Sequence, residues 1–157
     1  MASRNDGGHT HPQSTAKIGG HPIHPMLVPF PIVCFIGAFA ADILFLRDAW
    51  HPWAVGGRVL LVAGLIMAAL AAVTGLTDFL GEKRIQGPDA VKHMLANVTA
   101  VIIEVINLVL RWHNDAAIGK IGVYLSGIVV LILLYSGWKG GELVFRHGMG
   151  VQDNVNP

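Results

Sequence analysis

Residues 93–111 read HMLANVTAVIIEVINLVLR, a run long and apolar enough to cross a bilayer as a helix. Its polar residues fall in one narrow stripe at about 100° of rotation per residue. The stripe comprises His93, Asn97, Glu104, Asn107 and Arg111. Lipid offers a carboxylate or a guanidinium no partner, so we expect the stripe to face a protein interior, a cofactor or water. Function should therefore be sought along this stripe.

Three further apolar runs, with approximate limits of 27–46, 59–80 and 119–138, accompany this one, which we expect to span 92–112. Hydrophobic residues make up 53% of the 157-residue chain and charged residues 13%, against about 25% charged residues in soluble domains. Backbone groups in lipid must bond within their own segment, so each run is predicted to be a helix. The predicted fold is an all-α membrane protein, with four transmembrane helices in an up-down bundle and both termini on one side.

The predicted domain organisation is one four-helix transmembrane unit over residues 21–151, flanked by two tails. Residues 1–20 are polar and lack the apolar core of a cleavable signal peptide, so we expect a disordered tail. Residues 152–157 form a short C-terminal tail. Cys34 is the only cysteine, which excludes an intramolecular disulfide. The apolar runs make the lipid bilayer the expected environment, and a net charge of +1 without a basic soluble region argues against nucleic-acid binding.

Four spans bring residues that are far apart in sequence to the same membrane face. One face collects His21, His24, Asp78, Glu82, Arg84, His93, Glu142 and His147. The opposite face collects Asp42, Arg47, His51, Arg58, Asn107, Arg111 and His113. Four histidines thus share one rim, where a ligand or proton-transfer role and simple hydration are both open. That rim also carries more Lys and Arg near the span ends, so the positive-inside rule predicts cytoplasmic termini.

The carboxylates inside the membrane are expected to have partners. Asp42 and Arg111 lie at matched depth, so we predict that Asp42 contacts Arg111 or Asn107. Glu104 is predicted to be hydrogen-bonded within the bundle or protonated, because the middle of a membrane offers little water. Asp78 continues a face of small residues on the second helix, which directs its carboxylate into the bundle.

Two motifs near the ends of the chain are distinctive: GHPIHPMLVPFP at residues 20–31 and GGELVFRHGMGV at residues 140–151. With Asp42, the GLTD sequence at 75–78, His93, and Asn107 with Arg111, they resemble the bacterial membrane family catalogued as domain of unknown function 2231. Phe145 stands where relatives commonly have Tyr, a change that keeps the ring and loses a hydroxyl. The resemblance implies a four-helix membrane protein and names no activity. Some relatives resemble fusions to Rieske-type iron–sulfur domains, which implies proximity to electron transfer by association.

The leading interpretation is a small haem b protein of membrane electron transfer that works with a redox partner protein. Haem iron takes one or two neutral imidazoles from facing helices. His93 with His147 is the favoured pair, with His24 as the substitute, and Arg84 could pair with a haem propionate. Alternatively, three or four of His21, His24, His93 and His147 could hold zinc or copper.

Two other functions stay open. Protons, small ions or small solutes could move along the polar stripe, and this version needs a homo-oligomer because one four-helix unit is small for a transporter. The chain could also be a non-catalytic structural subunit of a membrane complex, with the stripe acting as polar glue between helices. The sequence leaves open whether the protein is an enzyme.

Overall fold

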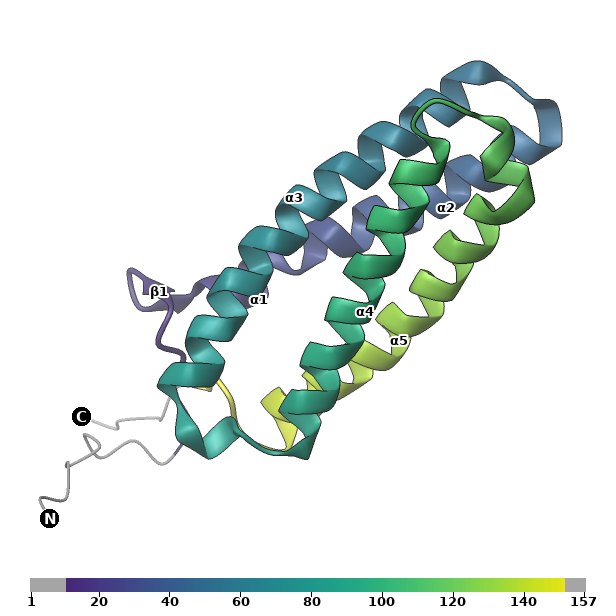
Figure 1. Cartoon of the computed structure of the whole chain (residues 1–157). Helices are drawn as coiled ribbons and strands as arrows, with labels where there is room; N and C mark the ends of the chain where they lie inside the picture. The colour runs from purple at the N-terminus through teal and green to yellow at the C-terminus, as the bar shows by residue number, and fades with distance from the viewer. Residues whose placement is uncertain (1–10, 152–157) are drawn as a thin grey trace, which may run out of the picture.

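The computed structural model describes residues 11–151 as an almost entirely helical bundle (Figure 1). Its elements are β1 (Lys17–Ile18), β2 (His21–Pro22), α1 (Ile23–Leu27), α2 (Pro29–Asp48), α3 (His51–Gly81), η1 (Lys83–Ile85), α4 (Pro88–Arg111), η2 (Ile118–Gly122) and α5 (Val123–Phe145). The short element η1 is a 3₁₀ helix and η2 is a π-helix. The predicted C-terminal tail and the first ten residues of the predicted N-terminal tail lie outside the described residues.

Four helices in the described part of the chain are long and apolar enough to cross a membrane: Ile23–Asp48, His51–Gly81, Pro88–Arg111 and Ile118–Phe145. The predicted all-α fold with four membrane helices is thereby confirmed. Pro52 and Pro88 occupy the first turns of α3 and α4, where the missing proline N–H leaves no helical bond unmade. These two helices consequently begin at residues 51 and 88 rather than at the predicted 59 and 92.

The helices pack as two pairs, α2 along α3 and α4 along α5. The pairs meet through α2 against α5 and α3 against α4. Figure 1 shows the connections at alternate ends of the bundle, as successive helices run back and forth. Large apolar side chains such as Val33, Leu70 and Leu131 are exposed on the outside of the bundle, as expected for a surface that meets lipid.

An apolar layer fills the middle of the bundle, and we call it the central layer. It consists of Phe35, Ala38, Leu61, Ala68, Ala100 and Val129. Close helix approach depends on small residues here, because a Cβ atom at Gly64 would lie 2.6 Å from the Phe35 ring. Along α4 and α5 the layer separates two groups of polar residues, one toward each end.

The segment before α1 differs from the predicted disordered tail. Ser14 is buried, and its hydroxyl donates to Asp78 Oδ1 near the end of α3 at 2.8 Å. The other end of the described chain joins this segment, since Gly150 N donates to Pro12 O at 3.0 Å. Gln13 Nε2 likewise donates to Val151 O at 3.0 Å. The polar composition that predicted disorder instead supplies hydrogen bonds to the bundle.

Candidate functional site

Buried polar side chains toward the α2–α3 turn form what we call the ion-pair cluster. Its members are Asp42 of α2, Glu104, Asn107 and Arg111 of α4, and Ser126 of α5, each at most 1% exposed. Arg111 Nη1 donates to Asp42 Oδ1 at 2.5 Å, and Arg111 Nη2 donates to Asp42 Oδ2 at 2.8 Å. The predicted contact between Asp42 and Arg111 is confirmed. Its bidentate geometry is the strong form of a carboxylate–guanidinium pair.

Asn107 and Ser126 complete this cluster. Asn107 Oδ1 accepts from Arg111 Nε at 3.1 Å and from Arg111 Nη2 at 2.6 Å. Asn107 Nδ2 donates to Ser126 Oγ at 2.9 Å and to Glu104 Oε2 at 2.8 Å. Ser126 Oγ in turn donates to Asp42 Oδ2 at 2.8 Å. Glu104 is therefore hydrogen-bonded within the bundle as predicted, although no residue in the range 11–151 bonds to its Oε1 atom.

Two half-buried histidine rings meet on the other side of the central layer, and we call them the histidine pair. The ring centres of His24 in α1 and His93 in α4 are 6.3 Å apart, and the ring planes make an angle of 89°. His24 Nδ1 lies 2.8 Å from the backbone oxygen of Ala71, and His93 Nδ1 lies 2.9 Å from that of Ser136. A carbonyl oxygen can only accept, so each neutral ring carries its proton on Nδ1 and a lone pair on Nε2.

Small residues and one amide surround the histidine pair. A Cβ atom on Gly75 would lie 2.8 Å from His24 Cε1, and one on Gly140 would lie 3.1 Å from His93 Cε1. Each ring therefore lies directly against a glycine of the neighbouring helix. Asn97 Nδ2 donates to His93 Nε2 at 3.2 Å, which fits a lone pair on that nitrogen.

The structure does not gather the other predicted histidine ligands into this site. His147 Nε2 lies 3.2 Å from Asp89 Oδ2, and His21 is exposed in β2. Among residues 11–151, no group of three or more His, Cys, Asp or Glu side chains is placed to hold a metal ion. Of the predicted four-histidine set, the structure pairs His24 with His93, whereas the sequence favoured His147 as the partner of His93.

Arg84 and Asp78 are both engaged with other parts of the chain. Arg84 Nε and Nη2 donate to the two Glu82 carboxylate oxygens at 3.1 Å and 2.8 Å. The hydrogen bonds from Arg84 lower the pKa of Glu82 to about 2. Asp78 is buried and accepts hydrogen bonds from the segment 14–16. The carboxylate of Asp78 thus points inward as predicted, with a partner in the N-terminal segment.

A polar group at the surface adjoins the ion-pair cluster. Asp115 accepts from Arg58 and lies 2.7 Å from His51 Nδ1, and Arg58 Nη1 also donates to the Arg111 backbone oxygen at 3.4 Å. Partial burial acts to raise the pKa of the Asp115 carboxyl, but the hydrogen bonds from Arg58 and His51 outweigh it and lower the pKa.

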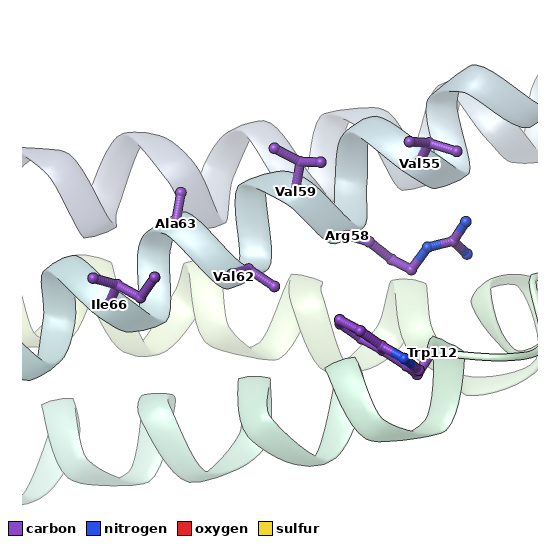
Figure 2. A pocket seen from close by; sticks show the side chains of 7 residues that line it. All are labelled: Val55, Arg58, Val59, Val62, Ala63, Ile66 and Trp112. Atoms are coloured by element: carbon purple, nitrogen blue, oxygen red, sulfur yellow. The ribbon is translucent and has the colours of Figure 1, made fainter.

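An open groove of about 510 Å³ lies beside the same end, between α3 and Trp112. Figure 2 shows the side chains that line it, which are Val55, Arg58, Val59, Val62, Ala63, Ile66 and Trp112. A binding site for a specific ligand usually has several polar groups that converge on it. Arg58 is the only charged residue in the lining, and it already bonds to Asp115. The histidine pair is therefore the stronger candidate for a functional site.

Some partners in both polar regions were not found from the sequence. Ser126 and Ser136 are not among the predicted partners. Both are serines in an otherwise apolar span, a pattern that could have indicated buried hydrogen bonds. The Ala71 backbone oxygen that holds His24 carries no signal in the sequence, because every residue has one.

Comparisons with known proteins agree with this membrane architecture. No curated protein and no solved structure matches the chain. The family described as "Predicted membrane protein (DUF2231)" matches residues 20–153, a range that includes both members of the histidine pair. The match covers most of the chain and bears out the resemblance seen in the two end motifs. The chain therefore belongs to this family of predicted membrane proteins, whose description names no activity.

Proposed function

We propose that this protein binds one b-type haem between His24 and His93 and takes part in electron transfer in the membrane. The observation that carries the proposal is the geometry of the histidine pair. Two imidazoles from different helices stand with ring centres 6.3 Å apart. When both bind one ion at about 2.0 Å per nitrogen, the ring centres are separated by about 6 Å. The observed separation fits two ligands of a common iron.

The hydrogen bonds of the two rings support the same proposal. Histidines that bind a metal usually donate the other ring N–H to a carbonyl or carboxylate, which fixes the tautomer and orients the ring. His24 and His93 both follow this pattern, with Nδ1 on the backbone oxygens of Ala71 and Ser136. The Nε2 lone pairs are then the ones offered to iron, and Asn97 would give up its contact with His93 Nε2 when haem binds.

The number of ligands favours haem over a bare metal ion. Structural zinc takes four protein ligands, and catalytic zinc takes three. Haem iron receives four nitrogens from the macrocycle and needs at most two from the protein. A pair of imidazoles inside a helical bundle meets that need, and bundle interiors are common cofactor sites.

The central layer weakens the case for transport. On α4 the polar stripe runs from His93 and Asn97 to Glu104, but Ala100 between them is buried in the central layer. A proton or ion moving along the stripe would have to cross this packed apolar layer. The ion-pair cluster, whose members bond to one another, is better explained as polar glue between the helices.

The proposal includes a location and a partner. We place the protein in the bacterial inner membrane with cytoplasmic termini, since Lys and Arg near the span ends favour that orientation. The residues concerned are Lys17, Lys83, Arg84, Lys92, Lys139 and Arg146 on one side, and Arg47, Arg58, Arg111 and Lys120 on the other. Electron transfer then requires a redox partner protein or a membrane electron carrier that reaches the haem.

The test is the haem content of protein purified in detergent from cells supplied with haem. We expect one haem per chain, with a Soret band that shifts to the red on reduction. His24→Ala and His93→Ala should each lose the bound haem or change its spectrum while the helical fold is kept. His147→Ala is the matched control, because His147 lies at the same end and bonds to Asp89.

Three results would overturn the proposal. The first is wild-type protein that stays free of haem under these conditions. The second is haem binding that survives both His24→Ala and His93→Ala. The third is bound zinc or copper without haem, measured by elemental analysis, which would assign the histidines to a bare ion.

A further inference from the structure

We propose that Asp78 is a positioning residue for the histidine pair: it fixes the segment 14–22, which we call the N-terminal strap, on α3 and so delivers His24 to His93. The inference rests on the proposed haem site for its functional meaning. Its structural half, that Asp78 places the His24 ring, stands independently. Neither the family description nor the sequence motifs give Asp78 this role.

One carboxylate oxygen of Asp78 accepts several hydrogen bonds from the start of the strap. Asp78 Oδ1 accepts from Ser14 Oγ, Thr15 N and Ala16 N, each at 2.8 Å. The carboxylate is 5% exposed and Ser14 is 4% exposed, so these bonds are shielded from water. An ionised acceptor of several backbone N–H groups makes a strong anchor.

The approach of the strap to α3 depends on a glycine. A Cβ atom at Gly81 would lie 2.4 Å from Thr15 Cγ2, so a side chain at position 81 would push the strap away. Thr15 Oγ1 also donates to the Thr77 backbone oxygen at 3.0 Å. The last turns of α3 thus hold the strap through Asp78, Thr77 and the space at Gly81.

The strap leads from Asp78 directly to His24. After Ala16 the chain turns through Gly19 and Gly20, which both have positive φ, and β2 returns antiparallel to β1. Ile23 N then donates to Ala16 O at 2.9 Å, which closes the loop one residue before His24. A residue anchored by Asp78 is therefore bonded to the neighbour of the proposed ligand.

The strap shares the placing of His24 with the packing of α1 against α3. The short helix α1 has no buried residue, so the free energy from burial of apolar surface is smaller there than in the long helices. The His24 ring bonds to the Ala71 oxygen, which lies seven residues before Asp78, or about 10 Å along α3. The His24 ring and the strap are thus bonded to α3 at two points. Loss of the strap bonds to Asp78 should therefore weaken the bond between His24 and Ala71.

The first experiment uses NMR to measure whether the His24 ring stays in place in haem-free protein. In protein labelled uniformly with ¹⁵N, the His24 Nδ1–H that donates to the Ala71 backbone oxygen should give a slowly exchanging imidazole N–H signal. We expect Asp78→Ala to broaden or abolish this signal and to speed amide exchange at Thr15, Ala16 and Ile23 by at least tenfold. Asp78→Asn keeps an acceptor oxygen without the charge and should be intermediate.

The second experiment reads the same variants with haem bound. Asp78→Ala should release haem faster than wild type and shift part of the ferric haem to a high-spin form with one axial histidine. Glu142→Ala is the control, because Glu142 lies at the same end and bonds to Lys139 and Arg146 instead. Ser14→Ala removes one donor to Asp78 and tests the anchor if the Asp78 variants fail to fold.

The outcomes separate this inference from the proposed function. An unchanged His24 N–H signal in both Asp78→Ala and Ser14→Ala would overturn the positioning role. A lost N–H signal accompanied by unchanged haem release and spin state would support the placing of His24 by Asp78 and overturn its importance for the haem site. A wild-type protein without haem would refute the haem site, and the N–H signal of the variants would still decide whether Asp78 places His24.

Discussion

The bundle contains two polar regions, one on each side of the central layer, that use their hydrogen-bonding groups in different ways. In the ion-pair cluster, every side-chain nitrogen of Asn107 and Arg111 faces an acceptor inside the bundle. In the histidine pair, each ring uses one nitrogen to fix itself on a backbone carbonyl, and the other nitrogen keeps a lone pair, which in His93 accepts from Asn97.

We interpret this difference as one between polar groups that stabilise the fold and polar groups that bind a ligand. A buried polar group must be satisfied, and groups that satisfy one another need no ligand. The Nε2 lone pairs of His24 and His93 come from different helices on rings that backbone carbonyls hold in place, so a metal ion could use both. We therefore expect substitutions in the ion-pair cluster to reduce stability and substitutions in the histidine pair to reduce ligand binding.

The largest effect is expected for Arg111→Met. It leaves the buried carboxylate of Asp42 without its cation, and breaking a buried pair in this way costs about 3–5 kcal/mol. The free energy of unfolding in detergent measures the loss. The double variant Asp42→Leu with Arg111→Met removes both charges and should recover much of the stability. If the double variant were no more stable than the single one, the ion pair would not be the reason for the loss.

The second effect concerns Glu104. Glu104→Leu removes the acceptor of Asn107 Nδ2 and should cost about 1–3 kcal/mol, the usual penalty for an unsatisfied buried donor. Glu104→Gln keeps that acceptor and should stay close to wild type in the same unfolding measurement. Equal tolerance of Leu and Gln would mean that Glu104 does not belong to an interior network.

The third effect concerns the packing of a glycine against the histidine pair. Gly75→Ala places a methyl group where the His24 ring lies and should weaken haem binding by about tenfold, as changes next to metal ligands do. Gly137→Ala is the control, because a Cβ atom there meets nothing within 4 Å. Haem dissociation rates give the measurement. A Gly75→Ala protein that keeps wild-type haem affinity would argue against a tightly placed ring.

The smallest effect is expected at the surface group next to the ion-pair cluster. The His51 side chain is 68% exposed, so His51→Ala should change stability by about 0–1 kcal/mol. The lowered pKa of Asp115 means that its contribution is present above its ordinary value of 3.8 and is lost as the pH falls below it. Acid titration of unfolding in Asp115→Asn should lack this loss. An identical acid dependence in wild type and Asp115→Asn would assign the loss to other carboxyl groups.

The sequence predicted the ion-pair cluster better than the histidine pair, for a physical reason. Asp42, Asn107 and Arg111 lie within long helices, whose period and depth determine which residues can meet. His24 lies in α1, after a turn with two glycines of positive φ, and no periodicity fixes that path. The sequence favoured His147 over His24 as the partner of His93, because depth alone does not say which rings face each other.

The N-terminal strap was missed for a related reason. Its polar composition is also typical of disordered tails, and only the position of Asp78 at the end of α3 shows where its N–H groups bond. Asp78 itself could be predicted to point inward, because it continues the small-residue face of the helix. Its partner could not, because two of the strap donors to Asp78 are backbone N–H groups, which every sequence supplies.

The most direct test of the haem proposal is the electron paramagnetic resonance spectrum of the purified ferric protein. Two histidine ligands predict low-spin iron, and ring planes at 89° predict a strongly anisotropic form of that signal. His24→Ala and His93→Ala should each convert any retained haem to a high-spin signal, whereas His147→Ala should leave the wild-type spectrum. A wild-type protein without a haem signal, or one whose signal changes with His147→Ala and not with His24→Ala, would contradict the assignment of the histidine pair as the haem ligands.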